Sequence, residues 1–378
     1  MTEHTGVPKT EPAPPEDQPI DDMLDGRDIH QWPDQFGQVI SYIHASLYED
    51  YSKHDTGAMR QRRSHVWASG IAIGAGTITI LLSLIGVVLE AHGSSWGIVH
   101  SKEISDGFWN AELFFFSIAV IFVIIGKSRT YWHENWLEER FCAEEYRTQK
   151  FRALLKNSLF CNPEKPWSER YSLWKSVFDD EVRTAKNKRN KSVEECIVSD
   201  AVSVPPPGTS GCSIDEGYMK ELVNYYQDKR LKTQIDYFDN RFDKLEKQDD
   251  LFRIILERGF YLSIFLVAIK LFIGSTILNS YGGIQPANTL ILLIMLSLPI
   301  MAFAVRTLRS STEVARTASL FRAKRNALEA FRDRLVLEIE RNPRNWEEIV
   351  KILWECENHL EEANREWVRI MKEAEWFV

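Results

Sequence analysis

Cysteine is scarce in this sequence and is not arranged in pairs. The 378 residues contain 5 cysteines, and no two of them are spaced as CxxC. This excludes the zinc-ribbon and thioredoxin-like patterns, which depend on such pairs. The odd count also argues against a disulfide framework. We therefore expect reduced thiols, as in the cytosol, at Cys142, Cys161, Cys196, Cys212 and Cys356.

Signatures of catalysis are missing as well. Gly126-Lys127-Ser128 resembles the end of a phosphate-binding loop, but Ile121 stands where the first glycine is required. His133-Glu134 begins like a zinc-protease motif, but Leu137 occupies the place of the second histidine ligand. The acidic residues that follow, including Glu144, are expected on a solvated helix face. The sequence predicts a protein that is not an enzyme and that has no metal or cofactor.

The excess of acidic charge is small and confined to one segment. Lys and Arg number 46 and Asp and Glu number 54, for a net charge of −8 and a mean hydropathy of −0.27. Residues 1–36 hold nine acidic residues against two basic ones, a local charge of −7, together with six prolines. Such a segment should be disordered. The nearly neutral remainder has no basic surface for direct nucleic-acid binding.

Four long apolar runs contrast with these averages. They are Val66–Leu89, Phe108–Gly126, Phe260–Tyr281 and Ala287–Val305. A helix of ~20 apolar residues crosses the ~30 Å hydrocarbon core of a bilayer. We therefore expect an all-α integral membrane protein, with four transmembrane helices in two hairpins and the lipid bilayer as its partner.

Basic residues next to these runs set the expected orientation. They are Arg60, Arg62, Arg63, Lys127, Arg129, Arg253, Arg258, Arg306 and Arg309. All of them lie on one side of the four runs, whereas residues 90–107 carry a single lysine and residues 282–286 carry no charge. Because Lys and Arg favour the cytoplasmic side, we expect a multi-pass cell-membrane protein with both termini and residues 127–258 in the cytoplasm.

The two halves of the chain repeat each other at an offset of 180 residues. Asn162-Pro163 then meets Asn342-Pro343, and Leu173-Trp174 meets Leu353-Trp354. Each half contains a lead-in helix, a membrane hairpin, a long cytoplasmic helix, an Asn-Pro break and a second cytoplasmic helix. The expected units are a disordered acidic tail over 1–36, a first repeat over 37–185, a flexible linker over 186–217 and a second repeat over 218–378.

The Asn-Pro pairs are expected to end the long cytoplasmic helices, because proline disfavours the α conformation at the residue before it. After the second break, apolar or small residues follow the 4-3 spacing of a coiled coil. This seam consists of Ile349, Leu353, Cys356, Leu360, Ala363, Trp367, Ile370 and Ala374. It can pack against the preceding helix of the same chain or against another subunit.

Several residues within the apolar runs are candidates for function. Lys270 lies near the middle of the third run, where a charge costs ~2.5–3.5 kcal/mol. It is either a residue that lines a water-filled path or pairs inside a bundle, or a lysine tolerated through distortion of the bilayer. Glu112 lies at the outer end of the second run, where it is either interfacial or part of a mouth that favours cations.

Small residues in the first run allow helices to approach closely. Gly70, Gly74 and Gly76 lie on one helix, a pattern that permits packing within a hairpin, oligomerisation or pore lining. Pro299 in the fourth run is expected to kink its helix.

The second repeat resembles SLATT domains, which are two-transmembrane effector modules. The resemblance rests on three motifs: Tyr226-x-x-x-Arg230-Leu231-x-x-Gln234-x-x-Tyr237-Phe238, Ala318-x-x-Phe321-x-Ala323, and Glu366-Trp367-Val368-x-x-x-Lys372-x-x-x-Glu375-Trp376. It covers residues 218–378 best, and residues 37–185 match the same architecture as a divergent first copy.

This resemblance implies a pore-forming membrane effector of a bacterial conflict, or anti-phage, system. Such a protein would be a homo-oligomer that opens when a nucleotide-synthesising or nucleotide-sensing partner responds to infection. The family offers no catalytic residues to transfer. The alternative is a non-conducting scaffold whose cytoplasmic coiled-coil helices recruit partners.

Overall fold

The computed structural model describes residues 32–92, 101–128, 131–188, 212–274, 285–311 and 314–373. Within these ranges the regular elements are helices and there is no β-strand, so the prediction of an all-α fold is confirmed. Residues 1–31 of the predicted tail and residues 189–211 of the predicted linker lie outside the described ranges.

The first half of the chain contains five described helices. They are α1 (Asp34–His92), α2 (Ser101–Ser128), α3 (Tyr131–Leu154), α4 (Asn157–Phe160) and α5 (Trp167–Lys188). The second half contains α7 (Glu216–Tyr225), the π-helix η2 (Tyr226–Lys232), α8 (Thr233–Gly274), α9 (Gln285–Ser311), α10 (Val314–Arg341) and α11 (Trp346–Glu373). The helices α5 and α7 thus take in both ends of the predicted linker 186–217.

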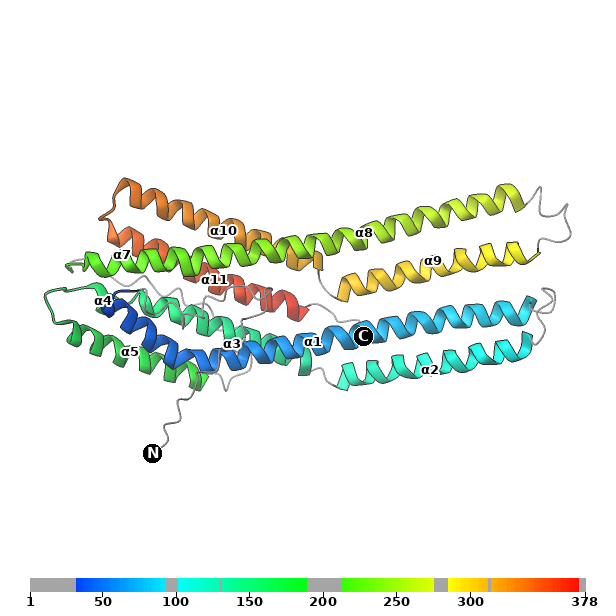
Figure 1. Ribbon diagram of the computed structural model, residues 1–378, viewed down its shortest axis with the longest axis horizontal. Coiled ribbons are helices and arrows are strands. Elements are labelled where there is room, and N and C mark those ends of the chain that lie inside the picture. The colour runs from blue at the N-terminus through cyan, green and yellow to red at the C-terminus, as the bar shows by residue number, and fades with distance from the viewer. Residues whose placement is uncertain are drawn as a thin grey trace, which may run out of the picture.

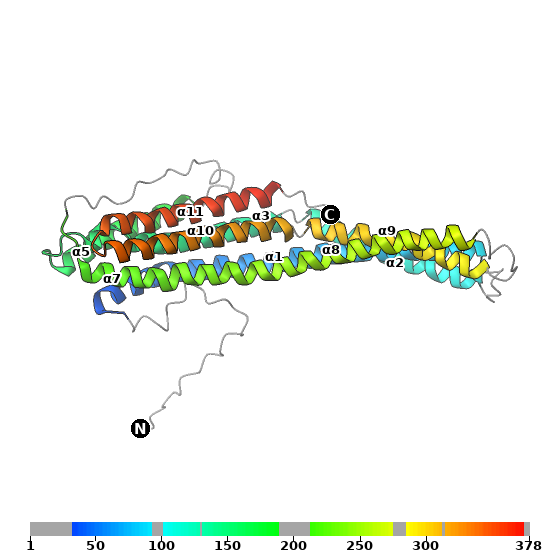
Figure 2. The same ribbon diagram turned by 90° about the horizontal axis from the view of Figure 1, so that it is seen from above.

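The molecule is elongated, and its two ends differ in character. Two long helices, α1 and α8, run along most of its length (Figures 1 and 2). At one end α1 pairs with α2 and α8 pairs with α9, forming two hairpins. At the other end α3, α5, α10 and α11 pack beside the remaining parts of α1 and α8.

A lead-in helix and a membrane helix are continuous in each half. Helix α1 has 59 residues, which at ~1.5 Å per residue is about 90 Å of helix. Gly57 in the part of this helix that precedes the apolar run lies close to α3, because an added Cβ would lie 3.2 Å from Cδ of Glu139. The α1–α3 contact therefore depends on the missing side chain.

The predicted helix break is correct in the second repeat and misplaced in the first. Helix α10 ends at Arg341, directly before Asn342-Pro343. In the first repeat, however, α3 ends at Leu154, well before Asn162-Pro163. The chain is already extended at Lys156, and Asn162 has a φ of 57°, a left-handed conformation that asparagine tolerates.

Burial explains why the first long helix ends early. Leu154, Leu155, Leu159 and Phe160 are all 0% exposed. An α-helix completes one turn every 3.6 residues, so neighbouring side chains point to different sides of it. A straight continuation of α3 would therefore place some of these four side chains on its outer face. The turn at Lys156 brings all four into the core, and this gain in burial outweighs the hydrogen bonds of a longer helix.

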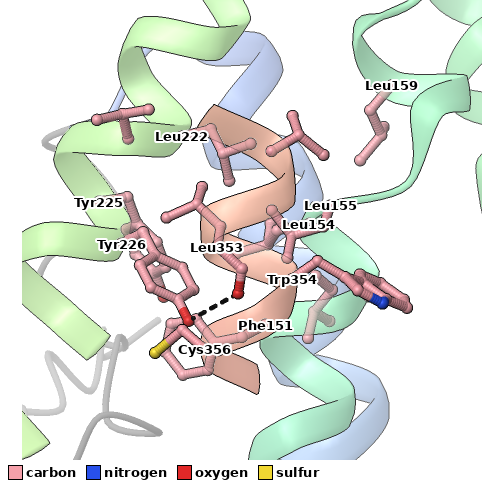
Figure 3. Packing of buried hydrophobic residues seen from close by; sticks show 14 of the residues in the cluster. Phe151, Leu154, Leu155, Leu159, Leu222, Tyr225, Tyr226, Leu353, Trp354 and Cys356 are labelled. Carbon is pink, nitrogen blue, oxygen red and sulfur yellow. Dashed lines mark hydrogen bonds between the residues drawn. The ribbon is translucent and has the colours of Figure 1, made fainter. Parts of the chain in front are cut away.

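The core of the end opposite the two hairpins is shared by both halves of the chain. Phe151 and Leu154 of α3, and Leu155 directly after it, meet Tyr226 of η2 and Leu353 of α11 (Figure 3). Helix α11 packs against both α3 and α10. Its seam is buried within one chain from Ile349 to Trp367, and Ala374 lies outside the described residues. Packing inside the chain, rather than between subunits, is therefore the correct interpretation of the seam.

Two cysteines depart from the expectation of reduced thiols. Cys161 and Cys212 form a disulfide, with Cα atoms 5.6 Å apart. The backbone holds them together, because Asn162 N–H donates to Ser213 O at 2.9 Å and Asp215 N–H donates to Phe160 O at 2.8 Å. The positions of the cysteines in the sequence could not reveal that the chain comes back to Cys161 at Cys212, 51 residues later. Cys142 and Cys356 are buried and are not part of a disulfide.

Candidate membrane region and buried charge network

Among the described residues, three helical segments are long and apolar enough to cross a membrane. They are Gln35–Leu89, Asp106–Ile125 and a segment that starts at Leu293 and includes most of α9. The apolar part of the first segment is the run Val66–Leu89 of α1. The remaining predicted run, Phe260–Tyr281, which is the third along the chain, continues past the described end of α8 at Gly274.

Large apolar side chains point outward from the hairpin end of the molecule. Phe114 and Ile124 on α2 are 61% and 59% exposed, and Phe303 on α9 is 71% exposed. The same holds for Phe260 and Phe265 on α8. A contiguous apolar surface of this kind is unfavourable in water and favourable in lipid.

Gly70 and Gly74, which lie about one helical turn apart, leave an open face on α1, and Gly76 lies on another side of the helix. An added Cβ at Gly70, Gly74 or Gly76 would meet no atom within 4 Å. The buried small residues of this part of α1 are instead Ala68, Ser69, Ala72 and Ala75. A surface groove of about 290 Å³ is lined by Val66, Trp67, Gly70 and Ile71. The close approach that glycine permits is therefore not used within the chain.

The other candidate residues lie on separate helices. Glu112 is half-buried on α2 and forms no ion pair with any described residue. Lys270 belongs to α8, but its side chain lies outside the described part of the structure. Pro299 is exposed and α9 continues through it from Gln285 to Ser311.

A buried ion pair joins η2 to α11 in the cytoplasmic core. Arg230 Nε and Nη2 donate to the two carboxylate oxygens of Glu357 at 2.9 Å and 2.8 Å. The side chains are 2% and 0% exposed. Tyr226 donates its hydroxyl hydrogen to Glu357 at 2.6 Å, and the guanidinium of Arg230 lies 4.6 Å from the ring centre of Phe151. Every hydrogen-bonding atom of the Glu357 carboxylate is thus engaged.

The residues of this pair explain one of the SLATT-like motifs. Tyr226 and Arg230 belong to the lead-in motif and lie in a π-helix, a rare element that often marks functional sites. Glu357 was missed, because an acid beside an apolar seam is usually solvent-exposed. The signal available in the sequence was that Glu357 directly follows Cys356, a residue of the apolar seam. Burial raises the pKa of the neighbouring Cys356 thiol to about 12, so this cysteine is unreactive at neutral pH.

A second network joins α1 to α3. Arg147 donates to Glu144 at 2.6 Å and to the hydroxyl oxygen of Tyr51 at 2.6 Å. Arg140 pairs with Glu144 and, at 2.9 Å, with Asp55. Burial alone would raise the pKa of Glu144, but the two arginines outweigh it and hold this pKa well below its usual range. The expectation that Glu144 lies on a solvated face was therefore wrong.

The described residues offer no site for a metal ion. No group of three or more His, Cys, Asp or Glu side chains within them is arranged to hold one. A groove of about 460 Å³ between α8 and α10 contains acids, but Glu246 pairs with Arg322 at 2.9 Å and Asp249 with Arg309 at 2.7 Å. These acids are neutralised by the chain itself.

No protein-family model, curated protein or solved structure matches this chain. The function must therefore be inferred from the chemistry of its own residues. That chemistry divides the molecule into an apolar end with outward side chains and a charged end with a closed, fully helical core.

Proposed function

We propose that the protein is an integral membrane effector that assembles into a pore, with four transmembrane helices and both termini in the cytoplasm. The observation that carries this proposal is the outward-facing apolar surface of both hairpins, represented by Phe114 on α2, Phe265 on α8 and Phe303 on α9. Lipid is the environment in which such a surface is stable.

A fourth span is supported by helix α8. This helix lies beside α9 along the apolar end (Figure 1). Phe260 and Tyr261 are exposed on α8, and the apolar run continues in the sequence to Tyr281. Two spans in each half, joined by a short outer loop, agree with the distribution of Lys and Arg.

Assembly into an oligomer is supported by the open glycine face of α1. Small residues drive helix association in lipid because they allow backbones to come into contact. Gly70 and Gly74 lie about one turn apart on the same side of α1, and no described atom lies within 4 Å of a Cβ added at either. A second subunit is therefore the natural occupant of that face.

The proposed biological role follows the resemblance to SLATT domains. The pore would serve a bacterial anti-phage system and would stay closed until a nucleotide signal or partner protein bound the open arrangement more tightly than the closed one. Because α11 contacts η2 of its own repeat through Glu357 and α3 of the first repeat through the aromatic contact between Trp136 and Trp367, the cytoplasmic core is suited to transmit such a signal.

A non-conducting scaffold is the second candidate. It is favoured by apolar side chains on the cytoplasmic helix α5, where Leu173 is 57% and Val177 is 41% exposed. Exposed apolar residues of this kind can bind a partner protein.

Ion flux from liposomes separates the two candidates. Purified protein in sealed liposomes should release a trapped ion when the trigger is supplied, either by the products of adjacent genes or by candidate cyclic nucleotides. If liposomes that hold the protein in the predicted orientation release no trapped ion under any of these conditions, the result would favour the scaffold.

A further inference from the structure

The helices of the two repeats follow one another in the same order across the molecule. At the end opposite the hairpins the order is α5, α3, α11 and α10, and at the hairpin end it is α2, α1, α9 and α8 (Figure 1). Helices α3 and α10 precede the Asn-Pro pairs of their repeats, and α5 and α11 follow them. The second repeat therefore continues the first in the same direction, whereas a two-fold arrangement would reverse the order.

The contact between the repeats is made by α3 of the first and α11 of the second. Arg152 Nη2 lies 2.6 Å from Glu361 Oε2 across this contact. Helix α5 covers α3 on another side, where Trp174 Nε1 donates to Ala153 O at 2.9 Å. At the hairpin end, α1 of the first repeat likewise contacts α9 of the second. Helix α3 is thus an inner member of its row, with a neighbour from each repeat.

Helix α10 lies at one edge of the row and has an exposed side. Asn326 and Ala330 are exposed, whereas Tyr146 and Lys150, at the equivalent positions of α3, are each 2% exposed. Leu337 near the end of α10 is 60% exposed. Positions that are buried in the inner helix are therefore open in the edge helix.

Helix α5 lies at the opposite edge and is exposed in the same way. Leu173 is 57% and Val177 is 41% exposed. The residue equivalent to Leu173 in the second repeat is Leu353, which is 1% exposed because α11 lies between α3 and α10. A leucine that is buried in the inner helix is therefore open to solvent in the edge helix, as expected of a surface that binds a partner.

We propose that α10 of one copy of the chain packs against α5 of the next copy, and that α8 packs against α2 in the same way at the hairpin end. The interface joins two different surfaces, so each chain keeps one of each kind and further copies can add until a ring closes. Each chain would then supply two successive units of the ring.

A second copy is the occupant that the fold itself favours. The chain already contains this succession once, because the second repeat adds to the first through α3 with α11 and through α1 with α9. A second copy placed after the first continues both rows without a change of direction. The interface rests on the proposed assembly into a pore, and it is separate from the open face at Gly70 and Gly74.

Crosslinking between engineered cysteines tests the interface in the full chain, in detergent or nanodiscs. The double variant Val177→Cys/Ala330→Cys carries one cysteine on α5 and one on α10, at opposite edges of the molecule (Figure 1). A short bis-maleimide should therefore join different chains and give a ladder of multimers on a denaturing gel. Each single variant should give no multimers, because a head-to-tail contact needs one cysteine of each kind.

Native cysteines and a matched pair of positions provide the controls. Cys142 and Cys356 are buried and the disulfide occupies two more cysteines, so the folded wild type should give no ladder. The control Val177→Cys/Glu362→Cys places the second cysteine at an exposed position of the inner helix α11 and should give no ladder either.

The outcomes separate this interface from the proposed pore. Dimers formed by either single variant would show a two-fold contact and would overturn the head-to-tail order. A double variant that gives no ladder, although light scattering shows an oligomer, would overturn the interface and leave the pore standing. Light scattering that shows single chains in both detergent and nanodiscs would overturn both.

A charge placed in the interface provides a second measurement. Leu173→Glu should weaken association of the chains by about tenfold or more, because the new carboxylate would be buried without a partner. The melting temperature should stay close to that of the wild type, because Leu173 is exposed within a single chain. An oligomer that forms as tightly with Leu173→Glu as without it would contradict the proposed contact.

Discussion

At the scale of single residues, the buried ion pair between Arg230 and Glu357 shows how the cytoplasmic core is specified. Both side chains are almost wholly buried, and each depends on the other for its charge. A buried pair adds little net stability over an apolar pair of the same shape. It does, however, penalise any arrangement that separates η2 from α11, so it fixes how the two elements meet.

We expect Glu357→Gln to destabilise the protein by about 3–5 kcal/mol, because it leaves Arg230 buried without a counter-charge. The matched control Glu348→Gln breaks a pair with Arg334 in which the side chains are 30% and 43% exposed, and should cost less than about 1 kcal/mol. Denaturant unfolding in detergent measures both. Equal losses for the two variants would contradict the role assigned to this pair.

Lys324 predicts a dependence of stability on alkaline pH. Its pKa is lowered from 10.5 to about 8 in the folded protein, so the unfolded chain binds the extra proton between these values. Stability of the wild type relative to Lys324→Met should therefore rise as pH increases from about 8 to 10.5, and be constant above that. The groups that face it are Arg140 and Glu144 on α3 and Glu366 on α11. A difference that is independent of pH would contradict the burial of this lysine.

Some of these residues could be predicted from the sequence and others could not. Tyr226 and Arg230 were identified as parts of a motif, but the motif did not reveal their shared partner, Glu357. Helical spacing places Glu144 on the same helix as many other acids, and nothing local distinguishes it from them. Its environment depends on α1, which approaches α3 only in the folded structure.

At the scale of elements, apolar periodicity predicted the helices well and their ends less well. Asn342-Pro343 ended α10 as expected, since proline acts locally. The early end of α3 at Leu154 depends instead on a core that is built from both halves. The Cys161–Cys212 disulfide likewise depends on where the chain returns after residues 189–211.

The disulfide predicts a simple pattern of labelling. Protein purified without reductant, then unfolded and treated with maleimide-polyethylene glycol, should gain three labels, because two of the 5 cysteines are paired. Reduction before labelling should give five, and Cys161→Ser should gain four without reduction. Five labels before reduction would show that Cys161 and Cys212 are free thiols. The count is read from the mobility of the bands on a denaturing gel.

The two small-residue faces of α1 predict opposite effects of leucine. Gly70→Leu adds a side chain where nothing lies within 4 Å of Cβ, so it should preserve the fold of a single chain and weaken the oligomer. Ala72→Leu enlarges a residue that is 6% exposed and should destabilise the hairpin by about 1–3 kcal/mol. Thermal unfolding and light scattering in detergent measure the two effects. An oligomer unchanged by Gly70→Leu would contradict assembly through this face.

At the scale of the whole molecule, the averaged composition hides two different environments. The mean hydropathy of −0.27 combines apolar hairpins with highly charged helices. The hairpins lie at one end of the molecule and the other helices at the opposite end (Figures 1 and 2). The hairpins carry exposed apolar side chains, and the other end contains buried ion pairs. Run length could predict this division, because a span of ~20 apolar residues is a local property. The packing of α11 against α3 and α10 depends on residues that are distant in sequence. The spacing of its apolar residues therefore could not predict which helices it contacts.

The most direct measurement of the central claim is the current across a planar bilayer that contains purified protein. We predict discrete, trigger-dependent conductance steps, and we expect Lys270→Leu to change their size if this lysine lines the path. The control Lys247→Leu removes an exposed lysine from the cytoplasmic part of the same helix and should leave the steps unchanged. A bilayer that shows no current above the protein-free level, at any voltage and with each trigger present, would contradict the pore.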